Sequence, residues 1–169
     1  MRSRRNDLFI NLTGFEPSEY HREARRKAGE AGVTIVPYRP EMLGQMREFV
    51  RKVNILQWFP DGWEDSFGKD DHTLVALQGE EIVGWAEYWP HPEKGGFGPI
   101  AVLPEERHHG IGTCLLLESM LRMKAQGVPE AIAGWAATEF YRRSGWEICR
   151  QYAALEKKLA STSEERIGP

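Results

Sequence analysis

A short glycine-containing stretch between two apolar segments constrains this chain more than any other part of it. Arg107 opens the stretch and Gly110 and Gly112 end it, after the apolar run 97–102 and before the leucine-rich run 113–121. This order predicts a strand, a turn and a helix. Glycine lets a backbone approach a ligand closely, and the unpaired N–H groups at a helix start attract anions, above all phosphates. The stretch therefore predicts a phosphate-binding loop.

The same motif, Arg-x-x-Gly-x-Gly between a strand and a helix, resembles the coenzyme A pyrophosphate loop of the GCN5-related N-acetyltransferase (GNAT) family. Residues 98–107 are similar to the family's fourth strand. Residues 140–146 resemble its second hallmark, an aromatic pair followed by a short helix, a glycine and an aromatic. A weaker resemblance is to the C-terminal domain of glucosamine N-acetyltransferase-like members. The resemblance implies an α/β fold with a mixed, twisted, mainly antiparallel sheet flanked by helices.

The chain has 169 residues, enough for one domain with a real hydrophobic core. Residues 1–32 are expected to be an N-terminal helical extension or linker, because they are rich in Lys and Arg and because residues 17–28 predict a polar helix. Residues 33–159 are expected to form the GNAT acetyltransferase domain, and residues 160–169 a polar tail.

Hydrophobic spacing along residues 33–159 predicts the order of strands and helices. The expected strands are 34–38, 73–77, 82–88, 97–102, 131–135 and 146–159, and the expected helices are 41–53, 113–126 and 139–144.

Bulk properties argue against several classes of partner. A formal net charge of −3 disfavours a general nucleic-acid binder, which would normally be basic. No apolar run approaches the ~18 residues that a membrane span needs, and the N-terminal arginines are not followed by the apolar segment of a secretory signal. Cys114 and Cys149 are expected to be reduced core residues, and His108 and His109 have no third ligand at metal-binding spacing. We therefore expect a cytoplasmic protein with no metal; a homodimer stays open.

Acetyl-CoA is the cofactor that the family resemblance implies. The backbone of the strand would pair with the pantetheine arm as an added strand would. The loop would hold the diphosphate. The cofactor-binding residues expected on these grounds are Ile100, Ala101, Val102, Arg107, His108, His109, Gly110, Ile111, Gly112 and Thr113.

Acetyl transfer to an amine also needs proton donors and acceptors. By resemblance, Tyr141 lies near the cofactor sulfur and donates a proton to the leaving thiolate. Glu87, on the strand 82–88, is the first choice for a general base, directly or through a water. Some relatives carry a polar or acidic residue after the fifth strand, but residues 135–138 hold two alanines there. Other carboxylates and a histidine remain as alternatives for the base: Asp61, Glu64, His91 and Glu93.

Aromatic residues mark the expected acceptor cleft. Four of the six tryptophans lie in residues 54–67 and 85–97, and aromatic faces bind sugar rings and cations. We name Trp58, Trp63 and Trp89 as acceptor-binding residues. The expected acceptor is the primary amine of a small molecule, an amino sugar or polyamine-like compound, ahead of a protein terminus.

Two other functions compete with the enzyme hypothesis. A non-catalytic acyl-CoA-binding or sensor module would keep the loop without turnover. An unrelated nucleotide binder is disfavoured, because a P-loop needs Gly-Lys-Ser/Thr where this chain has Gly112-Thr113-Cys114.

Overall fold

The computed structural model describes residues 5–54 and 72–152, and the fold is that of these two ranges. The strands are β1 (Arg5–Asn11), β2 (Val33–Pro37), β3 (Thr73–Gln78), β4 (Glu81–Trp89), β5 (Gly95–Val102), β6 (Glu130–Ala136) and β7 (Glu147–Tyr152). The helices are α1 (Glu19–Glu30), α2 (Leu43–Val53), α3 (Ile111–Ala125) and α4 (Thr138–Arg142), with short 3-10 turns at Pro40–Met42 and Pro104–Glu106. Among the helices in these two ranges, none is both long and apolar enough to cross a bilayer.

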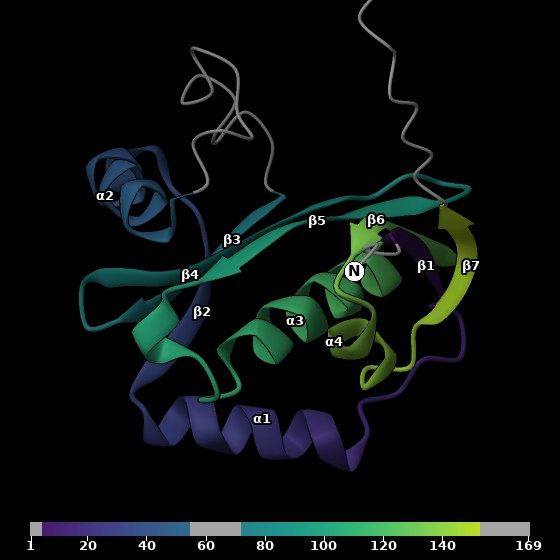
Figure 1. The fold of residues 1–169 in the computed structure, drawn as a ribbon, viewed down its shortest axis with the longest axis horizontal. Helices are drawn as coiled ribbons and strands as arrows, with labels where there is room; N and C mark the ends of the chain where they lie inside the picture. Colours follow the sequence, from purple (N-terminus) through teal and green to yellow (C-terminus); the bar gives the residue numbers. More distant parts are fainter. Residues whose placement is uncertain (1–4, 55–71, 153–169) are drawn as a thin grey trace, which may run out of the picture.

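All seven strands join one twisted sheet in the order β2-β3-β4-β5-β6-β1-β7 (Figure 1). Every neighbouring pair is antiparallel except β5 and β6, which are parallel. A parallel pair needs a crossover, and α3 provides it between these two strands. The mixed, mainly antiparallel sheet flanked by helices is the architecture expected from the sequence.

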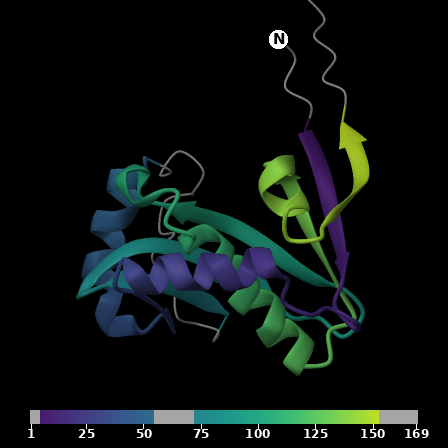
Figure 2. The ribbon, with the colours of Figure 1, turned by 90° about the horizontal axis from the view of Figure 1, so that it is seen from below.

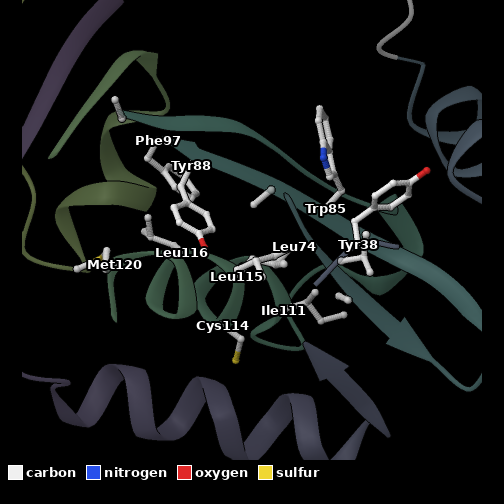
Figure 3. Close-up of a cluster of buried hydrophobic side chains, with 14 of the residues drawn as sticks. Tyr38, Leu74, Trp85, Tyr88, Phe97, Ile111, Cys114, Leu115, Leu116 and Met120 are labelled. Carbon is white, nitrogen blue, oxygen red and sulfur yellow. The ribbon is translucent and has the colours of Figure 1, made fainter. Parts of the chain in front are cut away.

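The leucine-rich helix α3 packs against one face of the sheet. Leu115 and Leu116 are fully buried, and Figure 3 shows Leu116 close to Tyr88 of β4 and Phe97 of β5. Trp85 of β4 projects from the opposite face of the sheet in the same view. Residues of β4 therefore alternate between the α3 face and the opposite face, as the period of a strand requires.

The strands and helices of residues 33–152 follow the sequence prediction closely. The hairpin β3–β4, the strand β5, the helix α3 and the short helix α4 are confirmed, with ends shifted by a few residues. Cys114 is buried as predicted, and it points toward α1 (Figure 3). The prediction for Cys149 is wrong, because this residue is exposed on β7, at the outer edge of the sheet.

The N-terminal segment departs from the expected extension. Its helix is the predicted one, now α1, but the strand β1 before it was not predicted and lies inside the sheet between β6 and β7 (Figure 2). Leu8 pairs with Ala133 on one side and Ile148 on the other, and Leu8 and Ile10 belong to the core. The strand was missed because its apolar run is only Leu8-Phe9-Ile10, next to an arginine-rich start. Residues 5–30 are thus packed into the same core as the domain.

Candidate active site

The predicted phosphate loop connects β5 to α3. Gly110 caps α3 with a left-handed backbone (φ 79°), and its carbonyl accepts a hydrogen bond from Cys114 N–H at 2.9 Å. His108 is also left-handed (φ 71°), which is uncommon for a residue other than glycine. The first-turn N–H groups of residues 111–113 have no carbonyl four residues before them within the helix. These are the N–H groups for which the sequence predicts anion binding.

The two loop glycines lie in different surroundings. A Cβ at Gly110 would lie 2.4 Å from the carbonyl oxygen of Ala24, on the backbone of α1. A Cβ at Gly112 would meet only the ring of Phe140 at 3.4 Å and Val102 at 3.7 Å, which is ordinary contact. Gly110 therefore allows α1 to approach, whereas Gly112 keeps open the space in front of the loop.

A cavity of about 780 Å³, here called the cofactor cavity, opens at this loop. Its lining includes three cationic residues and two carboxylates. Its walls are Tyr20, Glu23, Ala24, Lys27, Val53, Ile100, Ala101, Val102, Glu106, Arg107, His108, Gly110, Ile111, Gly112, Thr113, Phe140 and Arg143. The positive end of α3 and these cations suit an elongated anionic ligand.

A second cavity of about 570 Å³, here called the acceptor cavity, lies where β5 and β6 separate. These parallel strands pair only at Gly95–Ala131 and Gly96–Ile132. The cavity is lined by Trp89, Gly96, Phe97, Gly98, Pro99, Ile100, Ile132, Gly134, Trp135, Ala136, Ala137, Phe140 and Tyr141. Ile100 and Phe140 line both cavities, so the two meet at these residues.

An irregularity in β5 shapes this junction. Between Ala86–Ile100 and Tyr88–Phe97, β5 uses three residues where β4 uses two. Such a bulge bends a strand and increases its local twist. Gly98, with φ 116°, stands in it. The bulge coincides with the separation of β5 from β6, and so with the acceptor cavity.

Tyr141, the residue predicted to be the general acid, lines the acceptor cavity. Its ring packs edge-on against Phe97 (5.9 Å between centroids) and Trp146 (5.3 Å). The side chain is only 5% exposed, and burial raises the pKa of its phenol well above the ordinary value. The hydroxyl therefore keeps its proton at neutral pH and can act as a donor.

Glu87 lies on β4, opposite Thr73 of β3 and beside the bulge of β5. Burial raises the pKa of its carboxyl to about 7, and a hydrogen bond from Trp85 lowers it by less. A carboxyl with this pKa is half ionised near neutrality, which suits a general base. It shares a strand face with Trp89, two residues and roughly 7 Å further along. It does not itself line the acceptor cavity, so a water would have to connect the two.

Two exposed tryptophans stand at the acceptor cavity. Trp89 is 47% exposed and Trp135 is 60% exposed. Trp135 is left-handed (φ 51°), an unfavourable conformation for a bulky residue. Its backbone N–H donates to Asp7 of β1 at 3.1 Å, and the same carboxylate accepts the Tyr152 hydroxyl at 2.6 Å. Strained backbone conformations cluster at active and binding sites, which makes Trp135 a candidate acceptor-binding residue.

Asp7, Trp135 and Tyr152 were not among the predicted site residues. The sequence showed two alanines after β6 and no carboxylate there. The structure brings a carboxylate to the end of β6 from β1, which is more than a hundred residues away in the chain. No local pattern could have signalled this, because it depends on where β1 enters the sheet.

The other predicted site residues divide into three groups. Nine of the ten cofactor residues line the cofactor cavity, and the tenth, His109, instead contacts Glu106 (Nδ1 to Oε2, 3.2 Å). Two alternative bases, His91 and Glu93, lie in the exposed turn after β4. Four predicted residues lie outside the described ranges: Trp58, Asp61, Trp63 and Glu64.

Comparison with known proteins gives the same family as the motifs. A family model described as an acetyltransferase (GNAT) domain matches residues 69–148. Residues 69–148, a little under half of the chain, therefore resemble a GNAT acetyltransferase domain. The matched segment contains both cavities' central elements, from β3 to the start of β7. GNAT domains take their acetyl group from acetyl-CoA. Comparison of the sequence with curated proteins gives no match.

Solved structures share the fold at low sequence identity. The GNAT glucosamine N-acetyltransferase region of a fungal multi-domain GH3 β-N-acetylglucosaminidase aligns with a TM-score of 0.71 and 17% identity, over 89% of this chain and 20% of that one. A GNAT protein from Sphaerobacter thermophilus aligns with a TM-score of 0.68 and 22% identity, over 89% of this chain and 50% of that one. This chain therefore spans a fifth of the first protein and half of the second.

A GNAT acetyltransferase from Brucella melitensis, solved with acetyl-CoA, aligns with a TM-score of 0.55 and 20% identity, over 75% of this chain and 90% of that one. The residues present here fit the same cofactor. The loop offers first-turn N–H groups for a diphosphate, and Gly112 leaves the cavity in front of them open. Ile100 and Phe140 line both cavities, and Tyr141 lines the second of them.

Proposed function

We propose that this protein transfers the acetyl group of acetyl-CoA directly to the primary amine of a small molecule. The observation that carries the proposal is the meeting of two unlike cavities at Ile100 and Phe140, one beside the phosphate loop and one ending at Tyr141. A cofactor anchored at the loop can lie along β5 and present its thioester where β5 and β6 separate. An amine can reach the same point through the acceptor cavity.

The chain's own groups move two protons. Bound acetyl-CoA supplies an acetyl thioester, whose carbonyl carbon bonds to the amine nitrogen as the bond to sulfur breaks. Glu87, as a carboxylate, takes the proton that the amine loses, through a bridging water. The Tyr141 hydroxyl donates to the sulfur as it leaves, so one proton is taken from the nitrogen and one is given to the sulfur. Backbone N–H groups of β5 beyond Gly96, where β6 no longer pairs with it, are available to the carbonyl oxygen.

The acceptor cavity supports an amino sugar ahead of a polyamine-like compound. Its described lining contains no charged side chain, whereas two exposed indole rings stand at it. A polyamine would leave several ammonium groups without carboxylate partners, while a sugar ring can lie on an aromatic face. The fungal neighbour named for glucosamine acetylation is consistent with this preference.

Calorimetric titration with acetyl-CoA, with ATP and NAD as controls, tests the cofactor site. A panel of amino sugars, polyamines and peptide amino termini, assayed for thiol release, then tests the reaction. We expect saturable binding of acetyl-CoA alone and turnover with an amino sugar. Tyr141→Phe should lower kcat about tenfold or more while leaving the Kd for acetyl-CoA within about twofold. Binding with no turnover on any amine would instead support a non-catalytic acyl-CoA module.

A further inference from the structure

The N-terminal helix α1 precedes the segment that matches the GNAT family model, yet it forms one wall of the cofactor cavity. Four of its residues line this cavity: Tyr20, Glu23, Ala24 and Lys27. α1 runs along the outside of α3, on the side away from the sheet (Figures 1 and 2). The family match covers only residues 69–148, so it assigns nothing to this wall.

α1 is fixed against the phosphate loop by close contacts. The Ala24 carbonyl occupies the space that a side chain at Gly110 would need. The Tyr20 hydroxyl lies 3.0 Å from Thr113 Oγ1, in the first turn of α3, and the Arg143 guanidinium lies over the Tyr20 ring at 5.1 Å from its centroid. The helix is therefore held at the mouth of the anion site by contacts with α3 and with the residue following α4.

Lys27 is the one cationic residue of α1 among the lining residues of the cofactor cavity. Its Nζ lies 3.7 Å from Glu23 Oε1, which is too long for a good hydrogen bond. Glu23 already accepts two hydrogen bonds from Arg26, at 2.7 and 2.9 Å. Lys27 is half exposed, and within residues 5–54 and 72–152 this weak contact is its one ion pair. Arg26, by contrast, is committed to Glu23 and Glu30.

We propose that α1 is part of the cofactor site and that Lys27 binds the 3′-phosphate of coenzyme A. This inference rests on the proposed function, because it assumes that acetyl-CoA occupies the cavity. Coenzyme A carries a diphosphate and a separate ribose phosphate. One helix N-terminus with its glycine loop accommodates the diphosphate. The second phosphate needs a cation elsewhere on the wall, and Lys27 of α1 supplies it.

The test compares acetyl-CoA with acetyl-dephospho-CoA, which lacks only the 3′-phosphate, by calorimetry on the full chain. For Lys27→Gln we expect about fivefold weaker binding of acetyl-CoA at low ionic strength, with less loss at high salt, and no change for acetyl-dephospho-CoA. Arg22→Gln is the matched control. It removes the same charge from the same helix, but Arg22 pairs with Glu19 at 2.7 Å and does not line the cofactor cavity. We expect it to bind both ligands as the wild type does.

The outcomes separate the two proposals. Equal loss for both ligands, or no loss for either, would overturn the assignment of Lys27 while leaving the acetyl-CoA site intact. An Arg22→Gln effect as large as that of Lys27→Gln would also overturn it, because the effect would then reflect the net charge of α1. If the wild-type protein binds neither ligand, the proposed function fails and this inference fails with it. Thermal melts of both variants show whether α1 still packs on α3.

Discussion

The two cavities that meet at Ile100 and Phe140 differ in almost every respect. The cofactor cavity carries five charged residues and the unpaired N–H groups of a helix. The acceptor cavity has no charged residue in its described lining and two exposed indoles. The contrast fits their tasks. A phosphate ligand stays charged and needs cations, whereas an amine must be neutral to attack a carbonyl, and an apolar surrounding disfavours its charged form.

Gly112→Glu is the strongest way to break this contrast, because it places a carboxylate in front of the phosphate loop. We expect acetyl-CoA binding to fall at least about a hundredfold, beyond the range of calorimetry. Gly44→Glu is the control, since a side chain at Gly44 on α2 would meet nothing within 4 Å. Gly112→Ala, which has room, should fold normally and bind only slightly less tightly. Wild-type affinity in a folded Gly112→Glu protein would refute the phosphate-loop assignment.

Glu87→Gln tests the chemistry on the acceptor side. The carboxyl is a base only when ionised, so kcat should rise with pH around a midpoint near 7 in the wild type. The variant should lose about a hundredfold in kcat together with this pH dependence. Binding of acetyl-CoA should be unchanged. If the variant keeps the wild-type pH profile, Glu87 is not the base, and another of the candidate groups must accept the proton.

The same variant gives a stability signature that does not depend on substrate. Burial raises the pKa of Glu87 in the folded state from its ordinary value of 4.5 to about 7. Between these values the folded state binds more protons than the unfolded state, so this group makes the protein less stable as pH rises from about 4.5 to 7. Glu87→Gln should remove that loss. Urea unfolding at several pH values measures it, and parallel curves for the two proteins would mean that the carboxyl is not buried as described.

Trp135→Ala tests whether the exposed indole binds the acceptor, and its expected effect is the smallest of these predictions. Loss of the indole should raise the KM for the best acceptor about tenfold, while the Kd for acetyl-CoA stays unchanged. Trp146→Phe is unsuitable as a control because Trp146 is buried in the core. Tyr152→Phe is the better control, because it keeps the aromatic ring and removes the hydrogen bond to Asp7. It should show a smaller rise in KM. An unchanged KM for Trp135→Ala would exclude the indole from acceptor binding.

The cofactor side could be predicted from the sequence because its parts are contiguous. Arg107 to Thr113 supply the loop and helix start, and Ile100 to Val102 supply the strand just before them. The acceptor side could not be predicted to the same extent. Trp135 depends on a left-handed backbone, and its carboxylate partner comes from β1. Glu87 was named, but its raised pKa depends on burial that no local pattern encodes.

The position of β1 also means that both of its neighbours in the sheet come from the far end of the described sequence. Asn11 pairs with Glu130, and Asn6 pairs with Gln151, so β1 leaves the ribosome long before either of its neighbours. Until β6 and β7 are made, β1 has two unsatisfied edges. Pairings this distant in sequence slow folding. The strands β2 to β5 are neighbours in both sequence and sheet, whereas β1 is paired only once β6 and β7 have been made. The pairing of β6 with β1 is also what places Trp135 next to Asp7.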